Sequence, residues 1–194
     1  MDNVLVIMMG GKNTRMGCEK WDLHFDGMPL LQHIIKEVEP YYENIVLSTN
    51  RPEKYRYLGF PCIPDEVHGC GPIGGIFSVI NSFEADLYQF VPCDTPFIDG
   101  KTVNAITELT VNSDAGLLKT PDGPQPLFSC FTTRAREKLE SAIIRREFRI
   151  LKSLADLNVR KITISDLGIE NCWRKMFFNI NSPEDLEQAK QLCS

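Results

Sequence analysis

The feature that most constrains this chain is a glycine-rich stretch that follows a short apolar run near its start. The run Val4–Ile7 is followed at residues 8–20 by Met-Met-Gly-Gly-Lys-Asn-Thr-Arg-Met-Gly-Cys-Glu-Lys. Glycines let backbone N–H groups approach an anion closely, because no Cβ intervenes and positive φ is allowed. Arg15 adds a planar fork of donors and Lys20 a mobile positive charge, a pair suited to a polyphosphate. The stretch predicts a strand that ends in a phosphate-binding loop, although loops of this kind also serve as simple turns.

A parallel βαβ unit is predicted around this loop. Apolar residues recur at helical spacing over residues 30–41, and residues 44–50 form a second apolar run with a polar end. A strand, a helix and a strand joined over this length form a parallel pair with a right-handed crossover, and ligands bind at the carboxyl ends of such strands. Ser48 and Asn50 are therefore candidates to hydrogen-bond a ligand. A turn at residues 50–52 explains the same residues equally well.

Carboxylates follow the next two predicted strands. Asp65 ends the short run 62–65, and Asp94 follows the apolar run 87–92. A hard oxygen ligand at this edge suits Mg²⁺ that bridges phosphates, so Asp94 is the candidate metal ligand. The alternative for Asp94 is an N-cap of a helix predicted over residues 97–109, and the two roles are compatible.

A second glycine-dense segment lies between these two carboxylates. Glycine and proline at this density predict a loop, and the apolar residues that follow predict a helix from residue 76 to residue 81. Two such loops at strand ends favour a ligand site over an accidental turn. The segment contains Gly69, Gly71, Pro72, Gly74 and Gly75.

The second half of the chain predicts a mixed sheet. Residues 114–118 and 126–131 read as strands joined by a tight turn, hence an antiparallel pair, and a late strand is expected over residues 159–164. A final helix is expected with Ser182 as its N-cap. A helix over residues 132–144 is followed by a basic cluster that forms either a solvated surface or a contact with an anionic ligand. The cluster contains Arg145, Arg146, Arg149 and Lys152.

Composition narrows the class of protein. The 194 residues are 43% hydrophobic and 24% charged, which fits one domain over residues 1–194. A formal net charge of -5 argues against a nucleic-acid binder that relies on overall positive potential. No apolar stretch approaches the roughly 18 to 20 residues that span a bilayer, so no membrane partner and a cytoplasmic location are expected. Seven cysteines without a CxxC pair indicate neither a disulfide framework nor a zinc site.

Taken in order, these motifs resemble the molybdenum cofactor guanylyltransferases of the MobA type, within the nucleotidyltransferase superfamily that also contains sugar-nucleotide pyrophosphorylases. That family opens with Leu-Ala-Gly-Gly, Arg-Met-Gly and Asp-Lys, so Met8, Met9 and Glu19 are departures here. The resemblance runs nearly end to end. The matching residues are Met8–Gly11, Arg15–Gly17, Glu19–Lys20, Pro29–Leu30, Asn50–Arg51, Asp65, Gly71–Pro72 with Gly75, Cys93–Pro96, Gln125–Leu127 and Phe178–Asp185.

The resemblance implies an α/β fold of the nucleotide-diphospho-sugar transferase type. That fold is a Rossmann-like, three-layer α/β/α domain with a mostly parallel mixed central sheet. The resemblance also implies a nucleotide-binding N-terminal half and a pterin-binding C-terminal half. The implied catalytic residues are Arg15, Lys20 and Asp94, with Mg²⁺ on Asp94 as the cofactor. The implied nucleotide contacts are Met8, Met9, Gly10, Gly11, Lys20, Ser48, Asn50, Asp65, Gly71 and Asp94, and the implied pterin contacts are Asn179, Asn181 and Arg149.

The reaction implied is transfer of GMP from GTP to molybdopterin or its molybdenum-loaded form, with release of pyrophosphate. GTP and the pterin are then the substrates, and transient contact with a molybdenum-inserting protein or with molybdoenzymes is expected. Two alternatives stay open. One is a cytidylyl- or guanylyltransferase of another small phosphorylated substrate, because the bulkier Met9 could alter which base fits. The other is an inactive nucleotide-binding homologue.

Overall fold

The computed structural model describes residues 1–10 and 23–193. Its main element is a seven-stranded sheet. Among the described strands of this sheet, only β8 is antiparallel to its neighbours, so the predicted mostly parallel mixed sheet is confirmed. A separate hairpin pairs β2 (His24–Phe25) with β3 (Met28–Pro29). The order across the large sheet is β5 (Cys62–Ile63), β4 (Asn44–Ser48), β1 (Asn3–Met8), β6 (Leu87–Pro92), β8 (Gly123–Thr132), β7 (Ala115–Thr120) and β9 (Val159–Thr163).

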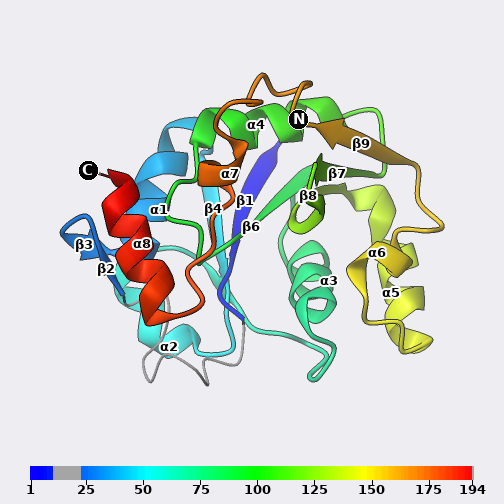
Figure 1. Cartoon of the computed structure of the whole chain (residues 1–194). Coiled ribbons are helices and arrows are strands. Elements are labelled where there is room, and N and C mark those ends of the chain that lie inside the picture. Colours follow the sequence, from blue (N-terminus) through cyan, green and yellow to red (C-terminus); the bar gives the residue numbers. More distant parts are fainter. Residues whose placement is uncertain (11–22, 194) are drawn as a thin grey trace.

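Helices cover both faces of the sheet, which gives the predicted three layers (Figure 1). One layer holds α1 (Leu30–Val38), α2 (Pro52–Tyr55), α4 (Gly100–Thr110), α7 (Trp173–Met176) and α8 (Pro183–Cys193). The other holds α3 (Pro72–Ser82), α5 (Arg136–Ile144) and α6 (Ile150–Ser153). Short 3-10 turns lie at Glu39–Tyr41, Arg56–Leu58 and Thr133–Ala135. None of the described helices is long and apolar enough to cross a membrane.

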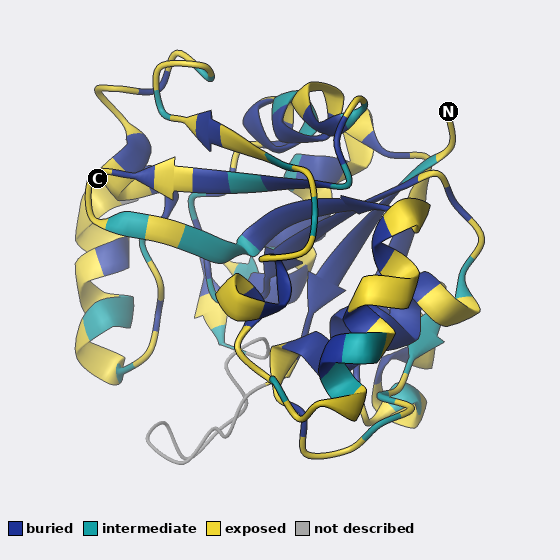
Figure 2. Cartoon of the chain, turned by 90° about the vertical axis from the view of Figure 1, so that its right-hand side faces the viewer, coloured by how far each residue is buried: buried dark blue, intermediate teal, exposed yellow. Residues whose placement is uncertain are grey.

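Strand β1 lies at the centre of both hydrophobic clusters. Leu5 and Ile7 pack into the cluster that includes α1 and α4, whereas Val4 and Val6 pack into the cluster that includes α3 and α5. All four side chains are fully buried, and Figure 2 shows the central strands buried between helices whose outer faces are exposed. Because helices cover both faces of such a sheet, its central strands are mostly apolar on both faces, with the buried Gln89 of β6 as a hydrogen-bonded exception. This explains the uninterrupted apolar run before the glycine-rich loop.

The predicted start of the helix at residue 76 is wrong. Helix α3 begins at Pro72, so Gly74 and Gly75 belong to its first turns rather than to the loop. Proline is favoured at the first helical position because its missing N–H needs no partner there. A Cβ on Gly74 would lie 2.9 Å from the Val67 carbonyl oxygen, so glycine is needed here for close packing against the preceding segment.

The predicted helix start at residue 97 is also wrong, because α4 begins at Gly100. Its N-cap is Asp99, whose Oδ2 accepts hydrogen bonds from the Thr102 backbone N–H at 2.8 Å and from Thr102 Oγ1 at 2.6 Å. Asp94 lies before this cap, in the turn that follows β6. The N-cap alternative for Asp94 is therefore wrong.

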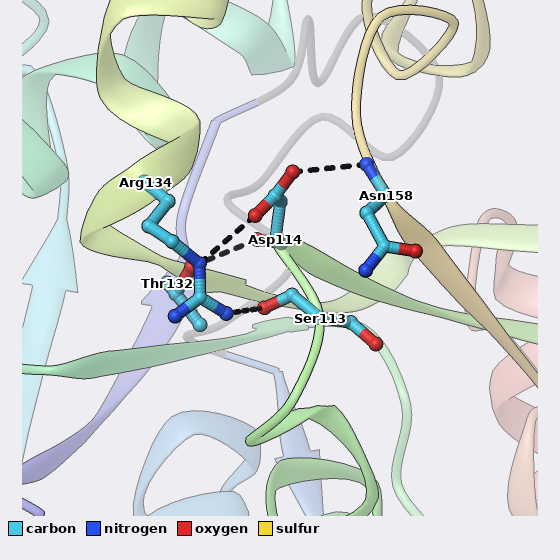
Figure 3. A network of polar contacts seen from close by, with 5 residues as sticks. All are labelled: Ser113, Asp114, Thr132, Arg134 and Asn158. Atoms are coloured by element: carbon cyan, nitrogen blue, oxygen red, sulfur yellow. Dashed lines mark hydrogen bonds and ion pairs between the residues drawn. The ribbon is translucent and has the colours of Figure 1, made fainter.

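At the amino ends of β7 and β9, a polar network joins three strands (Figure 3). Asp114 Oδ2 accepts from the Asn158 backbone N–H at 2.9 Å, and Asp114 Oδ1 accepts from Arg134 Nε at 2.9 Å. Arg134 Nη2 also donates to the Ser113 carbonyl, and the Thr132 backbone N–H donates to the Asp114 carbonyl at 3.0 Å. The Asn158 backbone hydrogen bond, with help from Arg134, holds the pKa of the Asp114 carboxyl below its usual value.

We expect Asp114→Ala to lower the free energy of unfolding by about 1–2 kcal/mol at neutral pH, because it removes charge-assisted hydrogen bonds at a partly exposed site. The folded-state pKa lies below the unfolded-state value, so this stability is present at neutral pH. It is lost as the pH falls through the lowered folded-state pKa. Denaturant unfolding of wild type and variant at neutral and acidic pH measures both effects.

The matched control is Asp122→Ala, which breaks a 3.4 Å ion pair with Arg174 in which both side chains are more than half exposed. Exposed pairs of this kind contribute little, so no clear change in stability is expected. A stability loss in Asp114→Ala that is the same at neutral and acidic pH would contradict the ionic origin of the effect.

Candidate active site

Neighbouring strands end at the same level at the carboxyl edge of the sheet. Met8 is in register with Ser48 on β4 and with Pro92 on β6. Beyond the strands, the Met9 backbone N–H donates to the Ser48 carbonyl at 3.0 Å and the Cys93 N–H donates to the Met8 carbonyl at 3.2 Å. The start of the glycine-rich loop, the polar end of β4 and the turn after β6 therefore lie side by side, as the sequence predicts.

A small corner forms where β1, β4 and α3 meet. A Cβ on Gly75 would lie 2.7 Å from Ser48 Oγ, 3.0 Å from Met8 Cε and 3.2 Å from Asp65 Oδ1. Ser48 is only 4% exposed, and no hydrogen-bond partner of its hydroxyl is found in the described part of the chain. A buried polar group of this kind needs an explanation. Sequence reasoning placed Gly75 in a loop and assigned it no role in the site.

Asn50 and Asp65 are joined by two hydrogen bonds. Asn50 Nδ2 donates to Asp65 Oδ2 at 3.1 Å, and the Asp65 backbone N–H donates to Asn50 Oδ1 at 2.8 Å. The turn alternative also has support, since Arg51 is the N-cap of α2 and its backbone N–H donates to Thr49 Oγ1 at 3.2 Å.

Burial, with a smaller contribution from the Asp65 carboxylate, raises the pKa of the neighbouring Cys70 thiol and keeps it protonated.

Gly71 precedes α3 in a conformation with φ 65° and ψ -152°, which is accessible to glycine and strained for other residues. Within the part of the chain that the structure describes, no side chain caps this helix start. The N-terminus of a helix favours negative charge, because its first N–H groups lack carbonyl partners within the helix. The predicted contact of Gly71 with the nucleotide stays a prediction.

The Asp94 turn is joined to a segment from the far end of the chain. The Ile180 backbone N–H donates to the Asp94 carbonyl at 2.8 Å. Asn179 and Asn181, the predicted pterin contacts, flank this residue. The half-buried Asp94 is followed by Thr95, which is fully buried and whose hydroxyl donates to the Pro92 carbonyl at 3.2 Å. The structure thus brings the predicted metal ligand together with two of the three predicted pterin contacts.

The start of α8 fixes this segment in place. Asp185 Oδ2 accepts from the backbone N–H groups of Asn181 and Ser182, each at 2.8 Å, and Ser182 Oγ accepts from the Asp185 N–H at 3.2 Å. This reciprocal arrangement is a capping box with Asp in place of Glu. The prediction that Ser182 is the N-cap is confirmed.

The structure does not bring Arg149 to the same place. Arg149 precedes Ile150, which packs in the cluster of α3 and α5, whereas Ile180 packs in the cluster on the opposite face of the sheet. The Arg149 side chain is 72% exposed, with Nε 3.4 Å from Glu147 Oε1. This geometry favours the solvated-surface interpretation of the basic cluster.

Several predicted residues lie outside the described part of the chain, namely Gly11, Arg15, Glu19 and Lys20. Of the described loop residues, Met9 is buried at 3% exposure and Gly10 is exposed. The Met9 side chain therefore packs in the hydrophobic cluster of α1 and α4, while its backbone N–H donates to the Ser48 carbonyl on β4.

A mostly parallel sheet, a glycine-rich sequence after its first strand and an aspartate after β6 define a class of α/β proteins that bind a nucleotide at the carboxyl edge of the sheet. Residues 5–159 match the family model described as the MobA-like NTP transferase domain. The chain therefore belongs to the MobA-like NTP transferase family and is a nucleotidyltransferase.

Individual relatives match over almost the whole chain. The molybdenum cofactor guanylyltransferase of Vibrio campbellii is 33% identical over 193 residues, which cover 97% of this chain and 95% of the relative. The crystal structure of molybdopterin-guanine dinucleotide biosynthesis protein A from Archaeoglobus fulgidus matches with a TM-score of 0.82 at 26% identity and covers 98% of both chains. The 4-diphosphocytidyl-2C-methyl-D-erythritol synthase of Anaerococcus prevotii shares the fold, with a TM-score of 0.73, 11% identity and coverage of 99% of this chain and 98% of that one.

Proposed function

We propose that this chain transfers GMP from GTP to molybdopterin or its molybdenum-loaded form and releases pyrophosphate. The observation that carries the proposal is the hydrogen bond from the Ile180 N–H to the Asp94 carbonyl, because it joins the C-terminal segment to the edge where β1 and β4 end. A nucleotide and a second substrate could meet there. The full-length match to the Vibrio guanylyltransferase supports guanine and the pterin as the two groups.

The reaction needs no covalent enzyme intermediate. A terminal phosphate oxygen of the pterin forms a bond to the α-phosphorus of GTP, and the bond from that phosphorus to the pyrophosphate oxygen breaks. The nucleophile is already anionic, so the protein contributes positioning and charge neutralisation. Arg15 and Lys20, which lie outside the described residues, would hold the phosphates.

Asp94 fits a magnesium ion of the kind that keeps water and substrate phosphates among its ligands. Among residues 1–10 and 23–193, no three His, Cys, Asp or Glu side chains gather to form a metal site of their own. Mg²⁺ is commonly bound by one or two carboxylates together with substrate phosphates, and the carboxylate of the half-buried Asp94 would be such a ligand. When bound, Mg²⁺ would offset charge on the α-phosphoryl group and the departing pyrophosphate.

Asp65 supports guanine as the base. Its Oδ2 accepts from Asn50, while its Oδ1 faces the corner formed by Ser48 and Gly75. A guanine edge offers two kinds of donor, the ring N1–H and the exocyclic amine, to a carboxylate, whereas the corresponding edge of cytosine offers only its amine. Ser48 Oγ would give or accept one further hydrogen bond in the corner.

The asparagines at positions 179 and 181 would contact the pterin, because amide side chains both donate and accept hydrogen bonds, as a pterin ring does. Arg149 is not part of this proposed contact, because it lies on the opposite face of the sheet with its side chain mostly exposed. We further propose a cytoplasmic location, where GTP is available, and transient contact with the protein that inserts molybdenum or with a molybdoenzyme that receives the product.

Pyrophosphate release tests the proposal directly. With Mg²⁺ present, we expect release that depends on GTP and molybdopterin together, and little release with ATP, CTP or UTP. Release with CTP would identify the chain as a cytidylyltransferase instead. Met9 would then be the first residue to test as the one that selects the smaller base. Tight GTP binding without any release would identify an inactive homologue.

A further inference from the structure

We infer that His33 is a positioning residue for the turn that carries Asp94. His33 Nε2 lies 2.8 Å from the Pro96 carbonyl oxygen. A carbonyl can only accept, so the imidazole carries a hydrogen on Nε2 and donates it. The inference rests on the proposed function, in which the Asp94 carboxylate holds the metal ion.

The turn needs an anchor at this point. Residues 93–96 leave the sheet, and their first backbone group is anchored by the bond from the Cys93 N–H to the Met8 carbonyl. Pro96 is buried, so its carbonyl oxygen needs a donor inside the protein. His33, from α1, is that donor. Asp94 thus sits between an anchor on β1 and an anchor on α1.

Aromatic packing fixes the orientation of the imidazole. The Phe25 ring lies edge-on to His33 with centroids 5.2 Å apart, and it also meets Phe97 at 5.5 Å. Phe97 in turn meets Phe178 at 6.3 Å. Edge-to-face contacts of this kind hold rings in defined orientations. The row of rings therefore links the β2–β3 hairpin, the end of the Asp94 turn and the residue that precedes Asn179.

Two substitutions separate positioning from mere packing. His33→Leu fills much of the space but cannot donate a hydrogen bond, whereas His33→Gln keeps a donor amide on a side chain of similar reach. Residues that orient a metal ligand typically change metal affinity by about 10- to 100-fold when they are replaced. We therefore expect His33→Leu to weaken Mn²⁺ binding to the GTP complex by about that factor, and His33→Gln to recover most of it.

The readout is Mn²⁺ titration by electron paramagnetic resonance in the presence of GTP, with thermal melting of each variant. GTP affinity without metal should change little. The matched control is His24→Leu, which removes an exposed imidazole from the neighbouring hairpin and should leave Mn²⁺ affinity unchanged.

Two outcomes overturn the inference. One is wild-type Mn²⁺ affinity in His33→Leu, and the other is equal loss of affinity in the Leu and Gln variants. Turnover of the wild type is assayed separately with GTP and molybdopterin. If the wild type binds Mn²⁺ and GTP but releases no pyrophosphate, the proposed reaction fails, while the Mn²⁺ series still decides the role of His33.

Discussion

Replacing Asp94 by Asn is expected to slow pyrophosphate release by about two to three orders of magnitude, by analogy with loss of a group that stabilises transition-state charge. The amide has nearly the same shape as the carboxylate but lacks its negative charge, so the variant would bind Mg²⁺ weakly. The backbone carbonyl that accepts from Ile180 is unchanged, and the fold should be retained. Initial rates over a range of Mg²⁺ concentrations measure the effect.

Asp99→Ala is the matched control, since it removes another acid from the same connection between β6 and α4. Asp99 caps α4 through the Thr102 N–H, and loss of such a cap costs about 1 kcal/mol of stability. The expected pattern is therefore reciprocal: Asp94→Asn loses turnover and keeps its melting temperature, whereas Asp99→Ala loses some stability and keeps turnover. A wild-type rate in Asp94→Asn would rule out Asp94 as the metal ligand.

The order of elements could be predicted because it depends on local patterns. The apolar run Val4–Ile7 and the helical spacing of α1 are readable without any contact being known, and together they predict the parallel pair that the structure confirms. The starts of α3 and α4 could not be read in this way. They depend on how closely Gly74 can approach the Val67 carbonyl and on whether Asp94 or Asp99 meets the first helical N–H groups.

The same distinction between local pattern and long-range contact applies to the candidate site. Parallel strands end at a common edge, so the proximity of Ser48 to the turn after β6 follows from the sequence pattern. The bonds from Ile180 to Asp94 and from His33 to Pro96 join residues that are far apart in the chain, and no spacing rule predicts them. A lone histidine in an amphipathic helix gives no signal of its partner. The placement of Arg149 on the opposite face likewise depends on where α6 packs.

Gly75 is the residue that the structure adds to the proposed nucleotide site. It lies on α3 against the ends of β1 and β4, where an added Cβ would be 2.7 Å from Ser48 Oγ and 3.2 Å from Asp65 Oδ1. Both groups are proposed to contact the base. The Met8 methyl group, at 3.0 Å, is flexible and can move aside, but a longer side chain would still occupy the corner.

Gly75→Val should weaken GTP binding by about 100-fold, which corresponds to about 3 kcal/mol, the upper end of the usual cost of overpacking. The added side chain would press on Ser48 Oγ and on the Asp65 carboxylate and displace them, and these are the two groups proposed to contact the base. Titration of GTP by calorimetry, with thermal melting of the unliganded protein, separates this effect from instability. Gly74→Ala is the comparison, because its Cβ would press on the Val67 carbonyl at 2.9 Å and should cost stability with less effect on GTP. If the two variants lose GTP affinity only in proportion to their loss of stability, Gly75 serves helix packing and the base lies elsewhere.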